Sequence, residues 1–153
     1  MKAKLVSMFA LLALGACAGT PETPANFDAS ACYERAFDIY FERYEDQLNA
    51  PAREAIDTVQ NQLRGCRIDS VRVLGLAGAA GGSRENFDLS ARRALYIAEY
   101  MEREPGWSQR NFQTVAAGEA GAVTETGEVE PMRRVARITV RASDPGTPAP
   151  AAN

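Results

Sequence analysis

Histidine is absent from the 153 residues of this chain. Histidine is the commonest general base in enzymes and the commonest metal ligand in proteins. Its absence excludes Ser-His and Cys-His nucleophilic catalysis and the usual zinc sites, so we expect no enzyme activity, no metal and no cofactor. Acidic pairs such as Glu99 and Glu102 have helical spacing, which predicts a solvated helix face rather than an acid-base pair.

The chain also has no excess of positive charge, because it contains 17 basic and 20 acidic residues. Proteins that bind nucleic acids carry a basic footprint. The net charge of −3 gives none, so we expect no nucleic-acid partner.

No apolar run is long enough to cross a bilayer, which takes roughly 20 residues in a helix. The longest such segment, residues 5–14, follows Lys2 and Lys4 and is typical of a cleavable signal peptide. It ends in Leu-Gly-Ala-Cys, which resembles the lipobox of bacterial lipoproteins. We therefore expect residues 1–16 to be removed and Cys17 to carry the lipid, palmitate included. The alternative is an ordinary cleavage site that leaves an unpaired thiol.

Residues 17–31 are rich in proline, threonine and small residues and predict a flexible tether. The residue after the cysteine is Ala18, and not the aspartate that retains enterobacterial lipoproteins in the inner membrane. This favours an outer-membrane lipoprotein whose domain faces the periplasm.

Two cysteines remain once Cys17 is lipidated, and an oxidising envelope would pair Cys32 with Cys66. A loop of this size predicts about 3–4 kcal/mol of stabilisation. The alternative is two buried free thiols.

One domain is predicted over residues 32–142, with a disordered tail over 143–153. Its first segment is ambiguous. Alternation of Phe37, Ile39 and Phe41 indicates a strand whose apolar side chains belong to the core, whereas the aromatic spacing from Tyr33 to Tyr44 also fits a helix.

The later segments have clearer patterns. We expect a helix capped by Asn49 and ending at Gly65, followed by a central strand over 69–77. A second helix is expected to begin near Asn86 to Asp88 and to stop before Pro105. Two further strands are expected over 112–117 and 135–142. The fold class is therefore α+β, with both helices on one face of a mixed sheet.

Residues 86–94, Asn-Phe-Asp-Leu-Ser-Ala-Arg-Arg-Ala, match the pattern Asn-x-x-Leu-Ser-x-x-Arg-Ala. With Gly118-Glu119 and Arg133-Arg134-Val135 further on, the chain resembles the OmpA-like C-terminal domain of peptidoglycan-associated lipoproteins over roughly 37–141. The resemblance implies a βαβαββ sandwich with a mixed four-stranded sheet. It also implies non-covalent binding of peptidoglycan through diaminopimelate of the stem peptide.

The resemblance assigns Arg93 to a ligand carboxylate, a task that suits a planar guanidinium. Asn86, Ser90 and Arg133 are the further expected contacts. Each has a plainer interpretation: Arg93 as a surface arginine paired with Glu99 or another acid, Asn86 as a helix cap, and Arg133 as solvated charge.

The chain departs from the family where an aspartate normally faces the ligand ammonium, because Gly78 stands there; Met132 likewise replaces an asparagine. Loss of a charged hydrogen bond weakens binding roughly 10- to 150-fold. Glu85 or Asp88 could supply the missing charge.

The predicted function is an outer-membrane lipoprotein that tethers the membrane to the cell wall. The alternative is a degenerate module that contacts an envelope protein through the apolar segment Leu76–Ala80.

Overall fold

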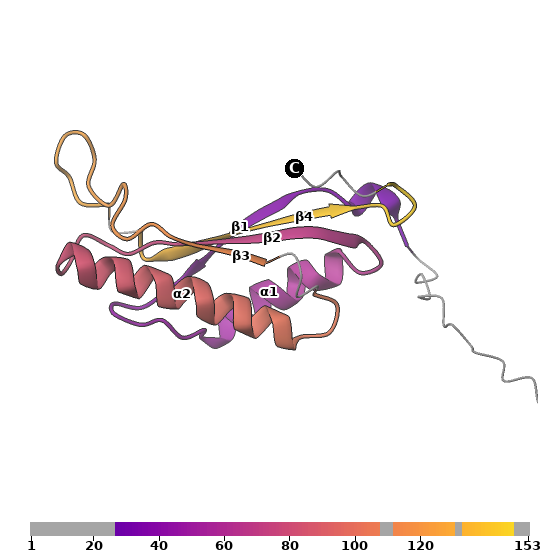
Figure 1. The fold of residues 1–153 in the computed structure, drawn as a ribbon, viewed down its shortest axis with the longest axis horizontal. Coiled ribbons are helices and arrows are strands. Elements are labelled where there is room, and N and C mark those ends of the chain that lie inside the picture. The colour runs from indigo at the N-terminus through magenta and orange to yellow at the C-terminus, as the bar shows by residue number, and fades with distance from the viewer. Residues whose placement is uncertain (1–26, 108–111, 131–132, 149–153) are drawn as a thin grey trace, which may run out of the picture.

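The computed structural model describes residues 27–107, 112–130 and 133–148. Four strands form one sheet in the order β1-β4-β2-β3. Their bounds are Arg35–Tyr40, Arg67–Gly75, Phe112–Ala116 and Val135–Ser143 for β1 to β4. β4 is antiparallel to β1 and β2, and β2 is parallel to β3 (Figure 1). The mixed sheet and the α+β class are confirmed.

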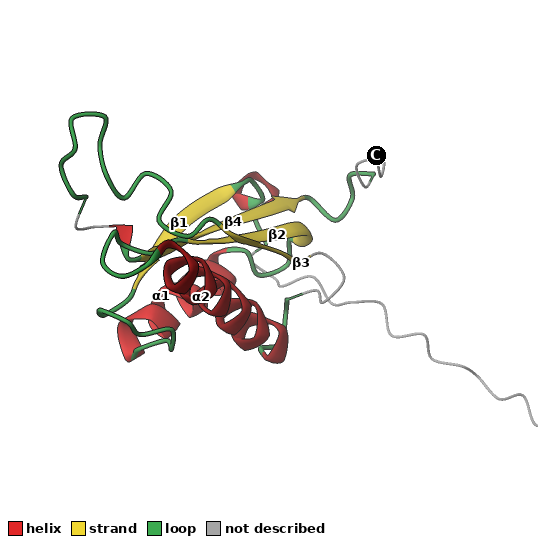
Figure 2. Cartoon of the chain, turned by 60° about the vertical axis from the view of Figure 1, so that its left-hand side comes forward, coloured by secondary structure: helices red, strands yellow, loops and turns green. Residues whose placement is uncertain are grey.

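Two helices cover one face of this sheet, α1 at Ala50–Gln62 and α2 at Ser83–Arg103 (Figure 2). The core lies between the helices and the sheet, where Ile56, Ile97 and Ile138 are fully buried. The other sheet face carries charged side chains, among them Arg137, which forms an ion pair with Asp38 across β1 and β4.

The ambiguous first segment is a strand. Ile39 and Phe41 are buried at 1% and 6% exposure, and Phe37 packs against the core opposite Ile138 of β4. A helix would have buried its tyrosines, but Tyr33 and Tyr44 are exposed. Period-2 burial therefore prevails over the aromatic spacing.

The helix starts differ in how well the sequence predicts them. Asn49 caps α1 as expected, and its Oδ1 accepts from the Ala52 N–H at 2.9 Å. α2 begins three residues earlier than predicted, at Ser83 after Gly82, so Asn86 lies inside the first turn and is not the cap.

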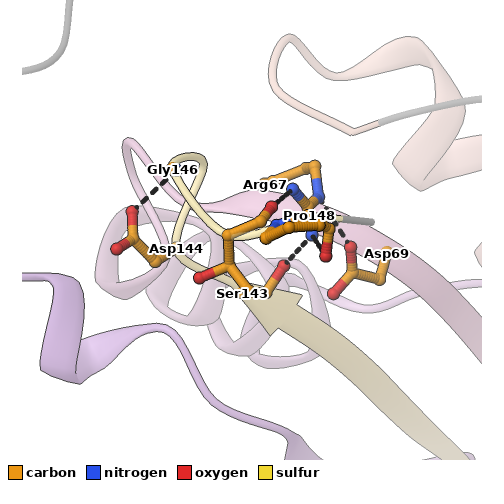
Figure 3. A network of polar contacts seen from close by, with 7 residues as sticks. Arg67, Asp69, Ser143, Asp144, Gly146 and Pro148 are labelled. Atoms are coloured by element: carbon orange, nitrogen blue, oxygen red, sulfur yellow. Dashed lines mark hydrogen bonds and ion pairs between the residues drawn. The ribbon is translucent and has the colours of Figure 1, made fainter. Parts of the chain in front are cut away.

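The two ends of the domain meet at the end of the sheet where β1 and β2 begin and β4 finishes. Cys32 and Cys66 form the predicted disulfide, with their Cα atoms 5.5 Å apart. β4 continues to Ser143, one residue past the predicted domain end, and the described chain continues to Pro148. Arg67 holds this segment by donating to Ser143 Oγ at 2.7 Å and to the carbonyl oxygens of Thr147 and Pro148 (Figure 3).

Residues 1–26, which include Cys17, and residues 149–153 lie outside the described structure. The predicted signal peptide, lipid site and most of the predicted tether are therefore untested. Within the described ranges, no helix has the length and apolar character needed to cross a membrane.

Candidate functional site

A pocket of about 140 Å³ lies at the end of the sheet where β1, β2 and β3 finish and α2 begins. In Figure 1 this is the left end of the molecule, beside the orange loop of residues 118–130. Ligands of open α/β sheets commonly bind beyond the carboxyl ends of strands. A larger hollow of about 560 Å³ lies beside Cys66 and Trp107, and Arg64 is its one charged lining residue among those described.

Charge distinguishes the small pocket. Its described lining includes three arginines, Arg43, Arg93 and Arg134, and one acid, Glu130. The other lining residues are neutral, namely Tyr44, Gly78, Ala79, Ala80, Asn86, Leu89 and Val129. The arginines come from three different parts of the chain: the turn after β1, the middle of α2 and the segment before β4.

Arg93 is fully buried, which rules out the surface arginine paired with Glu99. Its Nε donates to the carbonyl oxygen of Glu45 at 2.8 Å, Nη1 to that of Leu76 at 2.8 Å, and Nη2 to that of Glu42 at 3.2 Å. Its guanidinium also lies 4.7 Å from the centre of the Phe41 ring, within cation–π range. Glu99 instead pairs with Arg103 at 3.3 Å.

Burial lowers the pKa of Arg93 to about 10, chiefly through desolvation. This pKa still leaves the guanidinium charged at neutral pH. Arg93 therefore brings a permanent positive charge to the pocket wall, while its donors serve backbone carbonyls.

The same hydrogen bonds shape the pocket rim. Residues 42–45 form a turn closed by the Glu45 N–H bonding to the Glu42 carbonyl at 3.1 Å, and Tyr44 has a φ of 66°. A non-glycine residue in this region is strained. Because Arg93 holds the carbonyls at both ends of the turn, it fixes the positions of Arg43 and Tyr44 in the pocket.

Asn86 lines the pocket at 3% exposure, so the structure brings it together with Arg93 as predicted. Its Nδ2 donates to Glu119 Oε2 at 2.6 Å, and Ser83 Oγ donates to Glu119 Oε1 at 2.6 Å. These two hydrogen bonds, the one from Ser83 first, lower the pKa of Glu119. Glu119 thereby attaches the 118–130 loop to the start of α2.

Ser90 and Arg133 are not among the residues that line the pocket. The Ser90 hydroxyl donates to the Phe87 carbonyl at 2.7 Å and accepts from the Gly118 N–H at 2.9 Å. Arg133 donates from Nη2 to the Ala120 carbonyl. Both side chains therefore brace the 118–130 loop, and a direct contact of either with a ligand stays a prediction.

Arg134 takes the place that the sequence suggested for Arg133, and strand parity could have identified it. The inward-facing residues of β4 have even numbers, such as Ala136 and Ile138, whereas Arg137 faces outward. Continued backwards, this alternation puts Arg134 on the helix side. No comparable pattern marks Arg43 or Glu130, which lie in a turn and a loop.

Gly78 leaves the expected aspartate position open. A Cβ at Gly78 would meet only the Arg134 Cγ, at 3.5 Å, and Gly78 is not among the glycines with positive φ. Neither Glu85 nor Asp88 lines the pocket, so the predicted replacement acids are elsewhere; Glu85 folds back against Gly82.

The apolar segment proposed as a protein-binding lip is only partly accessible. Leu76 and Ala77 are buried, at 4% and 0% exposure, and only residues 78–80 reach the pocket. Within the described residues, no cluster of three or more His, Cys, Asp or Glu side chains could hold a metal ion.

Comparison with solved structures shows the same fold in several bacterial proteins. The OmpA-like domain of FopA1 from Francisella tularensis matches with a TM-score of 0.61 and 22% identity, covering 82% of this chain and 92% of that one. The peptidoglycan-associated lipoprotein of Burkholderia pseudomallei matches with a TM-score of 0.51 and 14% identity, covering 68% and 89%. The cell wall anchor of the T6SS from Pseudomonas aeruginosa matches with a TM-score of 0.51 and 19% identity, covering 72% and 83%.

No curated protein sequence matches the chain. The sequence model of the OmpA family matches residues 40–136, a range that contains both helices, β2, β3 and the pocket-forming turn, and the chain therefore belongs to the OmpA family.

Proposed function

We propose that this protein is a non-enzymatic lipoprotein of the outer membrane whose periplasmic domain binds peptidoglycan without a covalent bond. The observation that carries the proposal is the meeting of Arg43, Arg93 and Arg134 in one small pocket. Stem peptides of peptidoglycan present carboxylates, including those of diaminopimelate, and guanidinium groups are well suited to bind them.

The arrangement assigns different tasks to the arginines. Arg93 contributes charge and fixes the rim, because its hydrogen bonds go to the carbonyls of Glu42, Glu45 and Leu76. Arg43 is exposed and Arg134 half-buried, so their donors can reach a ligand carboxylate. The Asn86 amide, held by Glu119, lies in the same wall.

The position of the pocket suits a tethered domain. The described chain starts at Phe27, at the end of the sheet where β1 begins, and the pocket lies where β1 ends (Figure 1). A lipid on Cys17 would therefore anchor the domain from the side opposite to the binding surface. Two structural neighbours support a cell-wall role, being a peptidoglycan-associated lipoprotein and a cell wall anchor.

Co-sedimentation of the purified chain with purified sacculi tests the binding. Arg134→Gln should weaken it by roughly 10- to 150-fold, the effect of a lost charged hydrogen bond. The matched control is Arg141→Gln, which removes an exposed arginine of β4 that pairs with Glu34. Equal binding by both variants would contradict the proposed use of the pocket.

Intact mass of protein extracted from membranes tests the anchor. The chain from Cys17 to Asn153 should carry the added mass of a diacylglyceryl group, with or without an N-acyl group. A species with the bare polypeptide mass would refute the lipoprotein assignment.

A protein partner in the envelope is the second candidate. The rim of the pocket carries two exposed apolar side chains, Tyr44 and Val129, each 63% exposed. This function would be favoured if the wild-type chain did not bind sacculi but bound a specific envelope protein, and if Val129→Ser abolished that binding.

A further inference from the structure

The pocket brings together charges of opposite sign from different segments of the chain. Arg43 lies in the turn after β1 and Arg134 precedes β4, whereas Glu130 ends the 118–130 loop. The described lining thus contains two accessible arginines, one buried arginine and a single carboxylate. A ligand that pairs with both the accessible arginines and the carboxylate must present an anionic and a cationic group.

The backbone next to Glu130 is fixed rather than free. The Glu130 N–H donates to the carbonyl of Ala122 at 2.8 Å, and Ala122 is fully buried. The loop is joined to the sheet by the Ala77 N–H, which donates to the Gly118 carbonyl at 2.7 Å. The backbone of Glu130 is therefore held at the pocket wall.

The volume of the pocket limits the size of the group it can hold. An engineered apolar cavity of about 150 Å³ in another protein holds a benzene molecule, which has six heavy atoms. The pocket here measures about 140 Å³. The zwitterionic head of an amino acid, with its amino nitrogen, carboxylate, Cα and Cβ, also has six heavy atoms.

We propose that Glu130 is the acidic half of this site and binds the ammonium of a zwitterionic amino-acid head whose carboxylate is bound by Arg134 and Arg43. The inference rests on the proposed function only in naming the stem peptide as the source of that head. Glu130 then does from the 118–130 loop what an acidic side chain at position 78 would do from the end of β2. The site selects ligands by their free amine as well as by their carboxylate.

The test compares two chemically matched sacculus preparations, one intact and one whose amino groups have been acetylated. Acetylation removes the ammonium and leaves the carboxylates. The wild-type chain should bind acetylated sacculi at least about tenfold more weakly, the effect of one charged hydrogen bond. Glu130→Gln should bind intact sacculi about tenfold more weakly than wild type and should no longer distinguish the two preparations.

Two further variants make the result specific. Glu128→Gln alters a neighbouring acid of the same loop that does not line the pocket, and it should behave as wild type. Gly78→Asp combined with Glu130→Gln should recover binding to intact sacculi, because Gly78 has room for a side chain beside Arg134. Glu130→Gln that binds like wild type, or that still prefers intact sacculi, overturns the inference while leaving the proposed function standing.

A free diamino dicarboxylic acid, added to the full chain and followed by NMR chemical shifts, separates the remaining outcomes. Glu130-dependent binding of this molecule without sacculus binding supports the inference and refutes the cell-wall function. Binding of neither probe refutes both.

Discussion

The guanidinium of Arg93 donates to the carbonyl oxygen of Leu76 across 2.8 Å, joining the middle of α2 to the end of β2. With its bonds to Glu42 and Glu45, the same side chain also fixes the turn after β1. Arg93, the arginine of the family motif, therefore holds the pocket in shape as well as adding positive charge to it.

Replacing Arg93 with methionine should lower the free energy of unfolding by about 2–4 kcal/mol, because a buried carbonyl left without its donor costs about 1–3 kcal/mol and two more partners are lost. Urea unfolding followed by the fluorescence of Trp107, the one tryptophan in the sequence, measures this. The control is Arg92→Met, whose exposed ion pair with Asp46 should contribute less than about 1 kcal/mol. Equal losses from the two variants would contradict the structural role.

This result changes how binding data on Arg93 must be interpreted. A loss of sacculus binding in Arg93→Ala would follow from a displaced rim as readily as from a lost ligand contact. Arg134, which makes no comparable set of carbonyl contacts in the described structure, is the cleaner probe of ligand binding.

Two glycines at the end of β2 should respond oppositely to substitution. A Cβ at Gly75 would lie 1.9 Å from the Ser90 carbonyl oxygen, so Gly75→Ala should separate α2 from the sheet and cost more than about 2 kcal/mol. Gly78→Asp should fold as stably as wild type, because its Cβ makes one ordinary contact. Thermal melts of both variants check this, and a strongly destabilised Gly78→Asp would be the contrary result.

Tyr44 is a strained position at the rim. Its positive φ at the third place of a turn is the conformation in which glycine is preferred. Tyr44→Gly should therefore keep or raise the stability of the domain, whereas Tyr44→Val should lower it by about 1–2 kcal/mol. The same melts measure both, and Arg43→Gly, outside the positive-φ region, is the control.

The disulfide should stabilise the domain substantially. In a chain with Cys17→Ser, reducing Cys32–Cys66 should lower the free energy of unfolding by about 3–4 kcal/mol, the value expected for its loop length. A chain that also carries Cys32→Ala and Cys66→Ala should show a lower urea midpoint that no longer responds to a reducing agent. A midpoint unchanged by reduction of the native pair would contradict the prediction.

Acid should remove the contribution of the Asp38–Arg137 pair. Arg137 donates to both carboxylate oxygens at 2.8 Å and lowers the pKa of Asp38. A lowered pKa in the folded state stabilises the protein above the unfolded value of about 4, and this stabilisation disappears as the pH falls through the folded pKa. Asp38→Asn should therefore be less stable at pH 7, by up to about 1 kcal/mol for an exposed pair, and equal to wild type near pH 2.

Much of the fold follows from short patterns in the sequence. The signals that predicted these elements are local in the sequence: the alternation in β4, the Asn49 cap and the spacing of Ile56 and Leu63. The burial of Arg93 could also be predicted from the sequence, because Arg93 stands four residues after Leu89 and four before Ile97, on the buried face of α2.

The hydrogen-bond partners of Arg93 could not be predicted from the sequence, because they are set by tertiary structure. Arg93 bonds to carbonyls 17, 48 and 51 residues away, and any residue type can offer a carbonyl. The predicted start of α2 was wrong for the same reason. Asn86 is an excellent cap by type, but α2 begins before it, at Ser83, and its Nδ2 donates to Glu119, 33 residues away.

The disulfide and the pocket occupy opposite ends of the strands, which determines how the domain would carry force. A pull between the proposed membrane anchor at the amino-terminal end and the proposed ligand in the pocket would run parallel to β1. Such a pull loads the hydrogen bonds between β1 and β4 in shear, so that they resist together instead of opening one after another. Because Cys32 is bonded to Cys66, tension entering before β1 is shared with β2, a central strand paired on both sides.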